Sequence, residues 1–134
     1  MQAAILRIKL RHLNNSTNKR REVASEYIKN IVNSNIILPK IKNPLKDKSH
    51  VWHLFVIRTK NRNKLQKYLL DKGVQTLIHY PIPPHKQKAY KKLNKKKFPI
   101  TEKIHNQALS LPISSLQNKR DTFKIIECLN NWKI

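Results

Sequence analysis

The stretch Val51-Trp52-His53-Leu54-Phe55-Val56-Ile57 decides the fold expected of this 134-residue chain. Aromatic and β-branched residues, which favour strands, make up most of it. A run with so few polar residues is typical of a strand that is covered on both faces. The sequence therefore predicts a strand over residues 51–57 that is buried on both sides.

A helix and a second strand are predicted to follow. The helix has three apolar residues on one face, Leu65, Tyr68 and Leu69. Asn61 is suited to cap the start of this helix, and Gly73 is suited to end it. Residues 74–80 then form the second strand. It ends at the prolines 81, 83 and 84, because proline cannot supply the amide hydrogen that a strand centre donates.

The last third of the chain predicts two helices with an extended segment between them. Ile100, Ile104 and Ala108 mark a short helix that Thr101 could cap, and residues 109–112 are expected to be extended. Asn118 is expected to open the last helix. The buried stripe of that helix is predicted to be Phe123, Ile126, Leu129 and Trp132.

The first third predicts helix with two kinds of apolar pattern. Its later part has one apolar stripe, formed by Val23, Ala24, Tyr27, Ile28, Ile31 and Val32. Its earlier part is apolar on more than one face, through Ala3, Ala4, Ile5, Leu6, Ile8, Leu10 and Leu13. The rest of the chain is too small to cover several faces of one helix, so we expect its cover to come from outside the chain. An interruption is expected near residues 14–16.

The order of elements predicts an α+β fold in a single domain, residues 1–134, with the order of strands left open. No apolar run approaches the roughly 18 residues that a membrane span needs, and the first residues lack a signal-peptide pattern. Cys128 is the single cysteine, which excludes an internal disulfide. These features favour a cytoplasmic protein.

The net charge of +22 is the strongest compositional signal. Lysine outnumbers arginine about three to one, and the basic residues are spread along the chain. The densest runs, at 91–92 and 95–97, lie beside Tyr90 and Phe98. We interpret this region as a solvated lysine-rich loop. Contact with nucleic acid, or with the phosphates of a nucleotide-sugar, remains an alternative.

The sequence gives no support for a zinc site, a nucleophilic cysteine, a carboxylate pair or a glycine-rich phosphate loop. His50 and His53 are three residues apart, and in a strand such positions face opposite sides, which argues against a shared zinc ion. Cys128 lies on a presumed helix, where an apolar filling role is expected. The seven carboxylates form no obvious acid–base pair, and the single glycine, Gly73, excludes a glycine-rich phosphate loop.

The segment from Leu77 to His85 is the remaining candidate. It places His79 and Tyr80 at a strand end, just before a turn stiffened by prolines. Both side chains can donate and accept hydrogen bonds, and the tyrosine ring can lie against a sugar. From the residues alone, a purely structural aromatic–proline turn is the favoured interpretation, and a substrate contact is the alternative.

Four segments in order carry a resemblance to a known family: Gln2–Leu6, His50–Arg58, Ile78–His85 and Leu109–Pro112. Together they resemble the C-terminal part of the DegT/StrS-type sugar-nucleotide aminotransferases, across essentially all 134 residues. The His-Tyr-Pro-x-Pro-Pro form is most similar to members that make 3-amino-3,6-dideoxyhexoses on a dTDP carrier, enzymes of amino-sugar and O-antigen polysaccharide biosynthesis.

The resemblance implies the small C-terminal domain of an aspartate-aminotransferase-like fold, in a homodimer that uses pyridoxal phosphate. In that family the Schiff-base lysine, the aspartate at the pyridine nitrogen and the phosphate-binding serines precede the Gln-Ala-Ala segment. Because Met1 immediately precedes Gln2, the cofactor domain is expected to be missing. The resemblance therefore implies no catalytic, cofactor or metal residues here. It implies substrate contacts for His79 and Tyr80.

We accordingly expect a C-terminal fragment that binds no cofactor and is inactive alone. Its substrate in the full-length family would be a dTDP-linked keto-deoxyhexose. Two other interpretations stay open from the sequence: a basic nucleic-acid-binding module, and a part that completes an aminotransferase half encoded by a separate gene.

Overall fold

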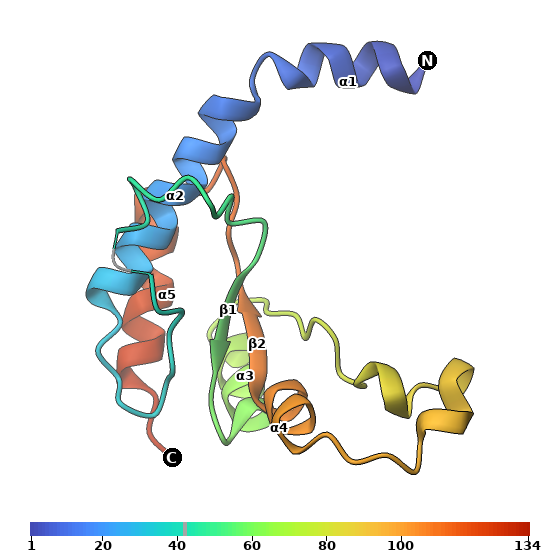
Figure 1. Ribbon diagram of the computed structural model, residues 1–134. Coiled ribbons are helices and arrows are strands. Elements are labelled where there is room, and N and C mark those ends of the chain that lie inside the picture. Colours follow the sequence, from blue (N-terminus) through green and yellow to red (C-terminus); the bar gives the residue numbers. More distant parts are fainter. Residues whose placement is uncertain (42) are drawn as a thin grey trace.

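A computed structural model describes residues 1–41 and 43–134 and has the α+β class that the sequence predicts (Figure 1). Its elements are α1 (Gln2–Leu10), α2 (Leu13–Asn30), β1 (Phe55–Arg58), α3 (Arg62–Asp71), the 3-10 helices η1 (Pro84–Lys86) and η2 (Lys88–Leu93), α4 (Pro99–Gln107), β2 (Ala108–Leu111) and α5 (Lys119–Asn131). Figure 1 shows α2 and α5 on one side of the two strands.

The sheet of the described residues consists of β1 and β2, paired antiparallel from Phe55 opposite Leu111 to Arg58 opposite Ala108. Two isolated bridges extend it, Ile37 to Arg58 and Leu77 to Ser110. Side chains directly opposite each other in an antiparallel pair lie on the same face. One face therefore carries four core residues, Phe55, Ile57, Leu109 and Leu111.

That core face packs against helices that bury one side each. Tyr27 of α2, Leu65 and Leu69 of α3 and Leu129 of α5 have no exposed surface. The Tyr27 ring meets the Phe55 ring edge-on, with centroids 4.9 Å apart. Its hydroxyl donates to the Pro112 carbonyl at 2.8 Å and accepts from Gln117 at 2.8 Å. Burial raises the pKa of Tyr27 above its ordinary value, so the hydroxyl stays a donor.

The first predicted strand is wrong at its beginning, because β1 starts at Phe55 rather than at residue 51. Trp52 adopts a left-handed backbone, φ 52°, which a strand cannot contain. Its amide donates to His50 Nδ1 at 2.9 Å, and its buried ring stacks on Phe55. Burial on both faces is also wrong: Phe55 and Ile57 are buried, whereas Val56 and Arg58 are half-buried.

The second predicted strand, residues 74–80, is wrong as well. Only Leu77 pairs with the sheet within the described residues, through the bridge to Ser110. The Val74 amide is used by the end of α3, where it donates to the Leu69 carbonyl at 2.8 Å. At the other end, the Tyr80 carbonyl accepts a hydrogen bond from a side chain, His105. The Val74 amide and the Tyr80 carbonyl are therefore hydrogen-bonded outside any strand ladder.

The expected end of α3 at Gly73 is confirmed. Gly73 has φ +76° and donates to the Leu70 carbonyl at 2.8 Å. Together with the bond from Val74 to Leu69, this is the Schellman pattern, which favours glycine at the left-handed position. Asn61 does precede α3, but its side chain makes no capping hydrogen bond to described residues.

The later elements agree with the sequence in outline. β2 confirms the extended segment, and the Asn118 side chain caps α5 by accepting from the Asp121 amide at 2.7 Å. Of the predicted stripe, Ile126, Leu129 and Trp132 are buried. The predicted burial of Phe123 is wrong, because this residue is 48% exposed, whereas Ile125 is buried. Thr101 is also wrong as a cap, because α4 begins at Pro99 and contains Thr101.

The N-terminal helix is interrupted at Arg11–His12, slightly before the predicted position. The α2 stripe is confirmed for Val23, Ala24, Tyr27 and Ile31, whereas Val32 is exposed. No residue of α1 is buried against the described part of the chain. Its apolar residues Ile5, Leu6, Ile8 and Leu10 are all more than half exposed. Figure 1 shows α1 projecting away from the rest of the chain.

Among the described residues, no helix combines the length and the apolar character that crossing a membrane requires.

The left-handed position of Gly73 gives a stability prediction. Gly73→Ala should lower the free energy of unfolding by about 1–2 kcal/mol, because alanine is strained at positive φ. A β-carbon there would meet Lys124 Nζ at 3.6 Å, an ordinary contact, so the cost comes from the backbone. Lys72→Ala, one residue earlier at φ −90°, is the matched control and should change little. Urea unfolding measures both; equal midpoints for the two variants would contradict the assignment.

Candidate functional site

The segment that carries His79 and Tyr80 lies beside β2, on the side away from β1. The bridge between Leu77 and Ser110 fixes its entry, with amide-to-carbonyl distances of 2.8 Å and 3.2 Å. Two residues later, His79 Nδ1 lies 2.9 Å from Ser110 Oγ. Ser110 is 3% exposed, so the His79 ring is held against the sheet by a buried hydroxyl.

Tyr80 has the opposite environment, because its side chain is 68% exposed. Its ring stands edge-on to the His79 ring, with centroids 5.6 Å apart. The peptide bond between the two residues is cis. The Tyr80 hydroxyl makes no hydrogen bond to the described residues, whereas the Tyr80 carbonyl accepts from His105 Nδ1 at 2.6 Å. The structure thus brings the two predicted site residues together, with the backbone held and the phenol open to solvent.

Sequence reasoning gave no role to His105, which holds Tyr80, or to His85 and Glu102, which hold the segment that follows. The buried His85 Nε2 lies 2.9 Å from Glu102 Oε1, and the Phe98 amide donates to the same oxygen at 3.3 Å. The Phe98 ring meets the His85 ring edge-on at 4.8 Å. Both hydrogen bonds favour the ionised carboxylate and lower the pKa of Glu102, that from His85 most strongly.

A signal for Glu102 was present in the sequence. It is the single carboxylate between Asp71 and Asp121, in the most lysine-rich part of the chain. A lone carboxylate among so many lysines is a candidate for a specific hydrogen-bond partner within the chain. Nothing in the local pattern identifies that partner as a histidine 17 residues away, because the contact depends on how η1 and α4 pack.

The other candidate residues do not converge on a site. His50 accepts from the Trp52 amide and its ring lies on the Trp52 ring, with centroids 4.1 Å apart. His53 is exposed, and Cys128 packs against the core. The described residues contain no group of three or more potential metal ligands. The lysines at 91–92 and 95–97 are exposed, in agreement with a solvated region, although residues 91–92 lie in η2 and not in a loop.

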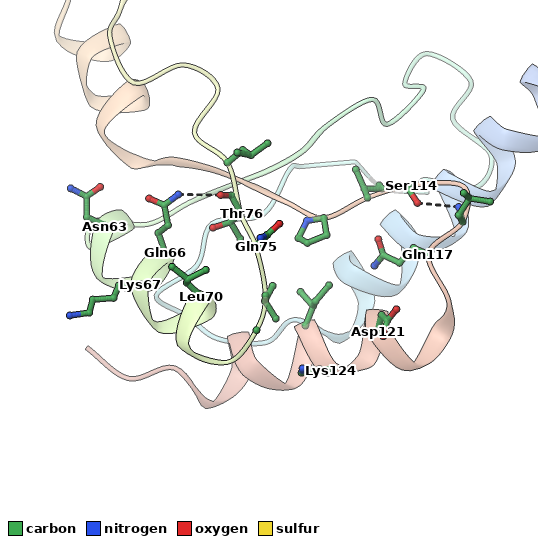
Figure 2. A pocket seen from close by; sticks show the side chains of 17 residues that line it. Asn63, Gln66, Lys67, Leu70, Gln75, Thr76, Ser114, Gln117, Asp121 and Lys124 are labelled. Atoms are coloured by element: carbon green, nitrogen blue, oxygen red, sulfur yellow. Dashed lines mark hydrogen bonds between the residues drawn. The ribbon is translucent and has the colours of Figure 1, made fainter.

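A cavity of about 1270 Å³ lies elsewhere, between α3, residues 73–77, the loop 112–117 and α5 (Figure 2). Amide and hydroxyl side chains dominate its labelled wall, and three of them, on Gln66, Ser114 and Gln117, are already paired. Gln117 donates to the hydroxyls of Tyr27 and Thr122. Gln66 donates to the Thr76 carbonyl at 3.2 Å, and Ser114 Oγ accepts from the Leu116 amide at 3.1 Å. His79 and Tyr80 do not line this cavity. It therefore supplies no imidazole or phenol to a ligand.

Solved structures show the same fold in aminotransferases. The chain matches S. venezuelae DesV in complex with a ketimine intermediate with a TM-score of 0.87 and 36% identity, over 98% of this chain and 36% of that one. It matches NtdA from Bacillus subtilis with bound cofactor PMP with a TM-score of 0.74 and 31% identity, over 85% of this chain and 27% of that one. The fold is that of part of an aminotransferase.

Residues 1–130 match the DegT/DnrJ/EryC1/StrS aminotransferase family, and the chain belongs to this family. It is 48% identical to the dTDP-3-amino-3,6-dideoxy-alpha-D-galactopyranose transaminase of Aneurinibacillus thermoaerophilus, over 98% of this chain and 36% of the relative. It is 36% identical to the dTDP-3-amino-3,4,6-trideoxy-alpha-D-glucose transaminase of Streptomyces venezuelae, over 98% and 35%. The chain spans about a third of the length of the curated relatives it matches.

The described residues do not fit pyridoxal phosphate by themselves. A site for this cofactor needs a lysine beside the ring and backbone amides around the phosphate. Every described lysine is exposed except Lys86, which is half-buried and donates to the Asn94 carbonyl at 2.7 Å. The one glycine, Gly73, ends α3 and leaves no glycine-rich phosphate loop in the sequence.

The lowered pKa of Glu102 predicts the pH at which acid breaks its contacts with His85 and the Phe98 amide. The ordinary value is 4.5, and the contact stabilises the native arrangement above it. This contribution is lost as the pH falls through the lowered native value. An NMR titration followed at the Phe98 amide should therefore show a midpoint below 4.5.

His85→Ala should raise that midpoint, because it removes the largest cause of the shift. His53→Ala, which removes an exposed imidazole, is the control and should leave the midpoint in place. A midpoint that is the same with and without His85 would show that the contact does not form in solution.

Proposed function

We propose that this chain provides the small, substrate-facing domain of a pyridoxal-phosphate-dependent transaminase that acts on a dTDP-linked keto-6-deoxyhexose. The observation that carries the proposal is the anchored His79–Tyr80 pair. The named activities of the relatives, both transaminases of dTDP-linked amino sugars, support the substrate class. Amino-sugar synthesis for a polysaccharide such as O-antigen, in the cytoplasm, is the setting that we propose.

His79 and Tyr80 would orient the sugar. With Nδ1 occupied by Ser110, His79 Nε2 has no hydrogen-bond partner among the described residues. The exposed Tyr80 offers both a hydroxyl and a ring face. Pyridoxal phosphate, held elsewhere in such an enzyme, supplies the electron sink for transamination. The two side chains would act by fixing the position of the sugar, and the proton transfers would fall to residues outside this chain.

We further propose that a cofactor-binding domain covers α1. This helix is apolar on several faces and has no cover among the described residues. In the view of Figure 1, α1 and the segment with η1 and η2 project on the same side, away from α2 and α5. One partner could therefore contact both. That domain would belong to the same longer protein or to a separately encoded half, and the assembly would be a homodimer, as the resemblance implies.

The test joins this chain to the cofactor domain of the Aneurinibacillus transaminase, its 48% identical relative. In this chimera, His79→Asn and Tyr80→Phe should each lower kcat/KM by about 5- to 150-fold. That range corresponds to about 1–3 kcal/mol for a polar group left without its partner. Cofactor absorbance should be unchanged, and the chain without the added domain should show no transamination.

His53→Asn is the matched control, because His53 is an exposed histidine outside the segment. It should retain the kinetics of the parent chimera. Unchanged kinetics in both site variants would refute substrate contact and leave the segment a structural turn.

The exposed α1 gives a second prediction. In the chain alone, Leu6→Gln with Leu10→Gln should increase the monomer yield and barely change the thermal midpoint, because both side chains are exposed. In the chimera the same pair should lower the midpoint, because it removes apolar cover from the proposed interface. Arg7→Gln with Lys9→Gln controls for altered charge on the same helix. Unfolding of the chain alone by the leucine changes would show that α1 is already covered.

A further inference from the structure

Ser110 makes three separate contacts with the candidate segment. Its amide donates to the Leu77 carbonyl at 2.8 Å, and its carbonyl accepts from the Leu77 amide at 3.2 Å. Its hydroxyl lies 2.9 Å from His79 Nδ1. In the pairing of β2 with β1, Ser110 lies opposite Val56. Because the amide and carbonyl of Ser110 both bond to Leu77, Ser110 and Val56 form a pair without backbone hydrogen bonds. One residue therefore sets both the backbone before His79 and the orientation of its ring.

The hydroxyl is unexpected for packing alone. Ser110 is 3% exposed and lies between Leu109 and Leu111 in a strand whose residues are all buried. Burying a hydroxyl is unfavourable unless it is hydrogen-bonded, and alanine would fill nearly the same space without that requirement. The partner that satisfies Ser110 Oγ in this structure is the His79 ring. The hydrogen bond to His79 is therefore the contact that accounts for a serine at this buried position.

The hydrogen bond also selects one orientation of the ring. The last torsion of a histidine side chain is broad and roughly two-fold, so an unheld imidazole can exchange the places of Nδ1 and the carbon opposite it. A bond at Nδ1 favours one of the two states and leaves Nε2 on the far side of the ring. The backbone cannot swing instead, because Leu77 and the Tyr80 carbonyl are both held.

We propose that Ser110 is a positioning residue, which holds the His79 imidazole so that Nε2 is presented to the sugar. The inference rests on the proposed substrate contact of His79. It adds that the contact depends on a buried serine in β2, which touches no substrate itself. His105 is the companion anchor, since its Nδ1–H donates to the Tyr80 carbonyl, which can only accept.

The first measurement needs only this chain. Long-range ¹H–¹⁵N NMR of the His79 ring reports the protonation of its two nitrogens. Ser110→Ala should move both nitrogen shifts and broaden the ring signals, because the two ring orientations become comparable. Ser114→Ala removes another serine hydroxyl, on the loop after β2, and should leave the His79 signals in place. His79 signals that are identical in Ser110→Ala and in the parent would overturn the proposal.

The second measurement uses the chimera with the Aneurinibacillus cofactor domain. Ser110→Ala should lower kcat/KM about 3- to 10-fold, the equivalent of one neutral hydrogen bond, without changing cofactor absorbance. Ser110→Thr keeps the hydroxyl and should restore most of the loss wherever circular dichroism shows the parent fold. In a His79→Ala background, Ser110→Ala should have no further effect, because no ring is left to hold.

The outcomes separate the two proposals. If His79→Ala keeps the parent kcat/KM, substrate contact by His79 is refuted, whatever Ser110 does. If His79→Ala lowers kcat/KM but Ser110→Ala costs the same with and without His79, the serine acts on the fold in general and the positioning role is refuted. Loss of the Ser110 effect in the His79→Ala background supports it.

Discussion

The pairing of β2 with its two neighbours is the interaction on which the rest of this structure depends. On one side β2 pairs with β1, which brings Leu109 and Leu111 level with Ile57 and Phe55 and creates the face that α2, α3 and α5 bury. On the other side it holds Leu77 and, through Ser110, His79. A four-residue strand thus joins the hydrophobic core to the candidate site, so a shift in its register would move both.

Electrostatics explains how the segment after His79 can be ordered at all. Its seven lysines between residues 86 and 97 repel one another, and its 3-10 turns bury little. One carboxylate, Glu102, accepts from both His85 and the Phe98 amide and so ties the two ends of this basic stretch to α4. Because α4 runs directly into β2, the anchors at Glu102, His105 and Ser110 belong to one continuous piece of chain. That piece positions the whole segment.

The sequence predicted what depends on neighbours along the chain. The helices, the glycine at the end of α3 and the asparagine cap of α5 follow from local periodicity and local hydrogen bonds. The strands were less predictable, although residues 51–54 and 74–80 have strand-like composition. The Trp52 amide donates to the His50 side chain in a turn, and the Val74 amide donates to the Leu69 carbonyl at the end of α3. His79 and Tyr80 were predicted as site residues from their motif, and their contact with a substrate stays a prediction. Ser110, Glu102 and His105 were missed because their contacts span 17 to 31 residues.

The helix α1 is too short to be stable by its local interactions alone. A nine-residue helix is shorter than the roughly 12–15 residues at which isolated helices become even marginally stable in water, and its first turn has no side-chain cap. Local propensity is therefore too weak to maintain it, and tertiary contacts of an apolar face normally provide the difference. Among the described residues α1 has no such contacts, although its apolar side chains are in place for them. This supports our proposal that α1 is one half of an interface. In the view of Figure 1, α1 and the segment following His79 and Tyr80 project on the same side of the sheet, which agrees with the proposal that one cofactor-binding domain covers α1 and completes the candidate site.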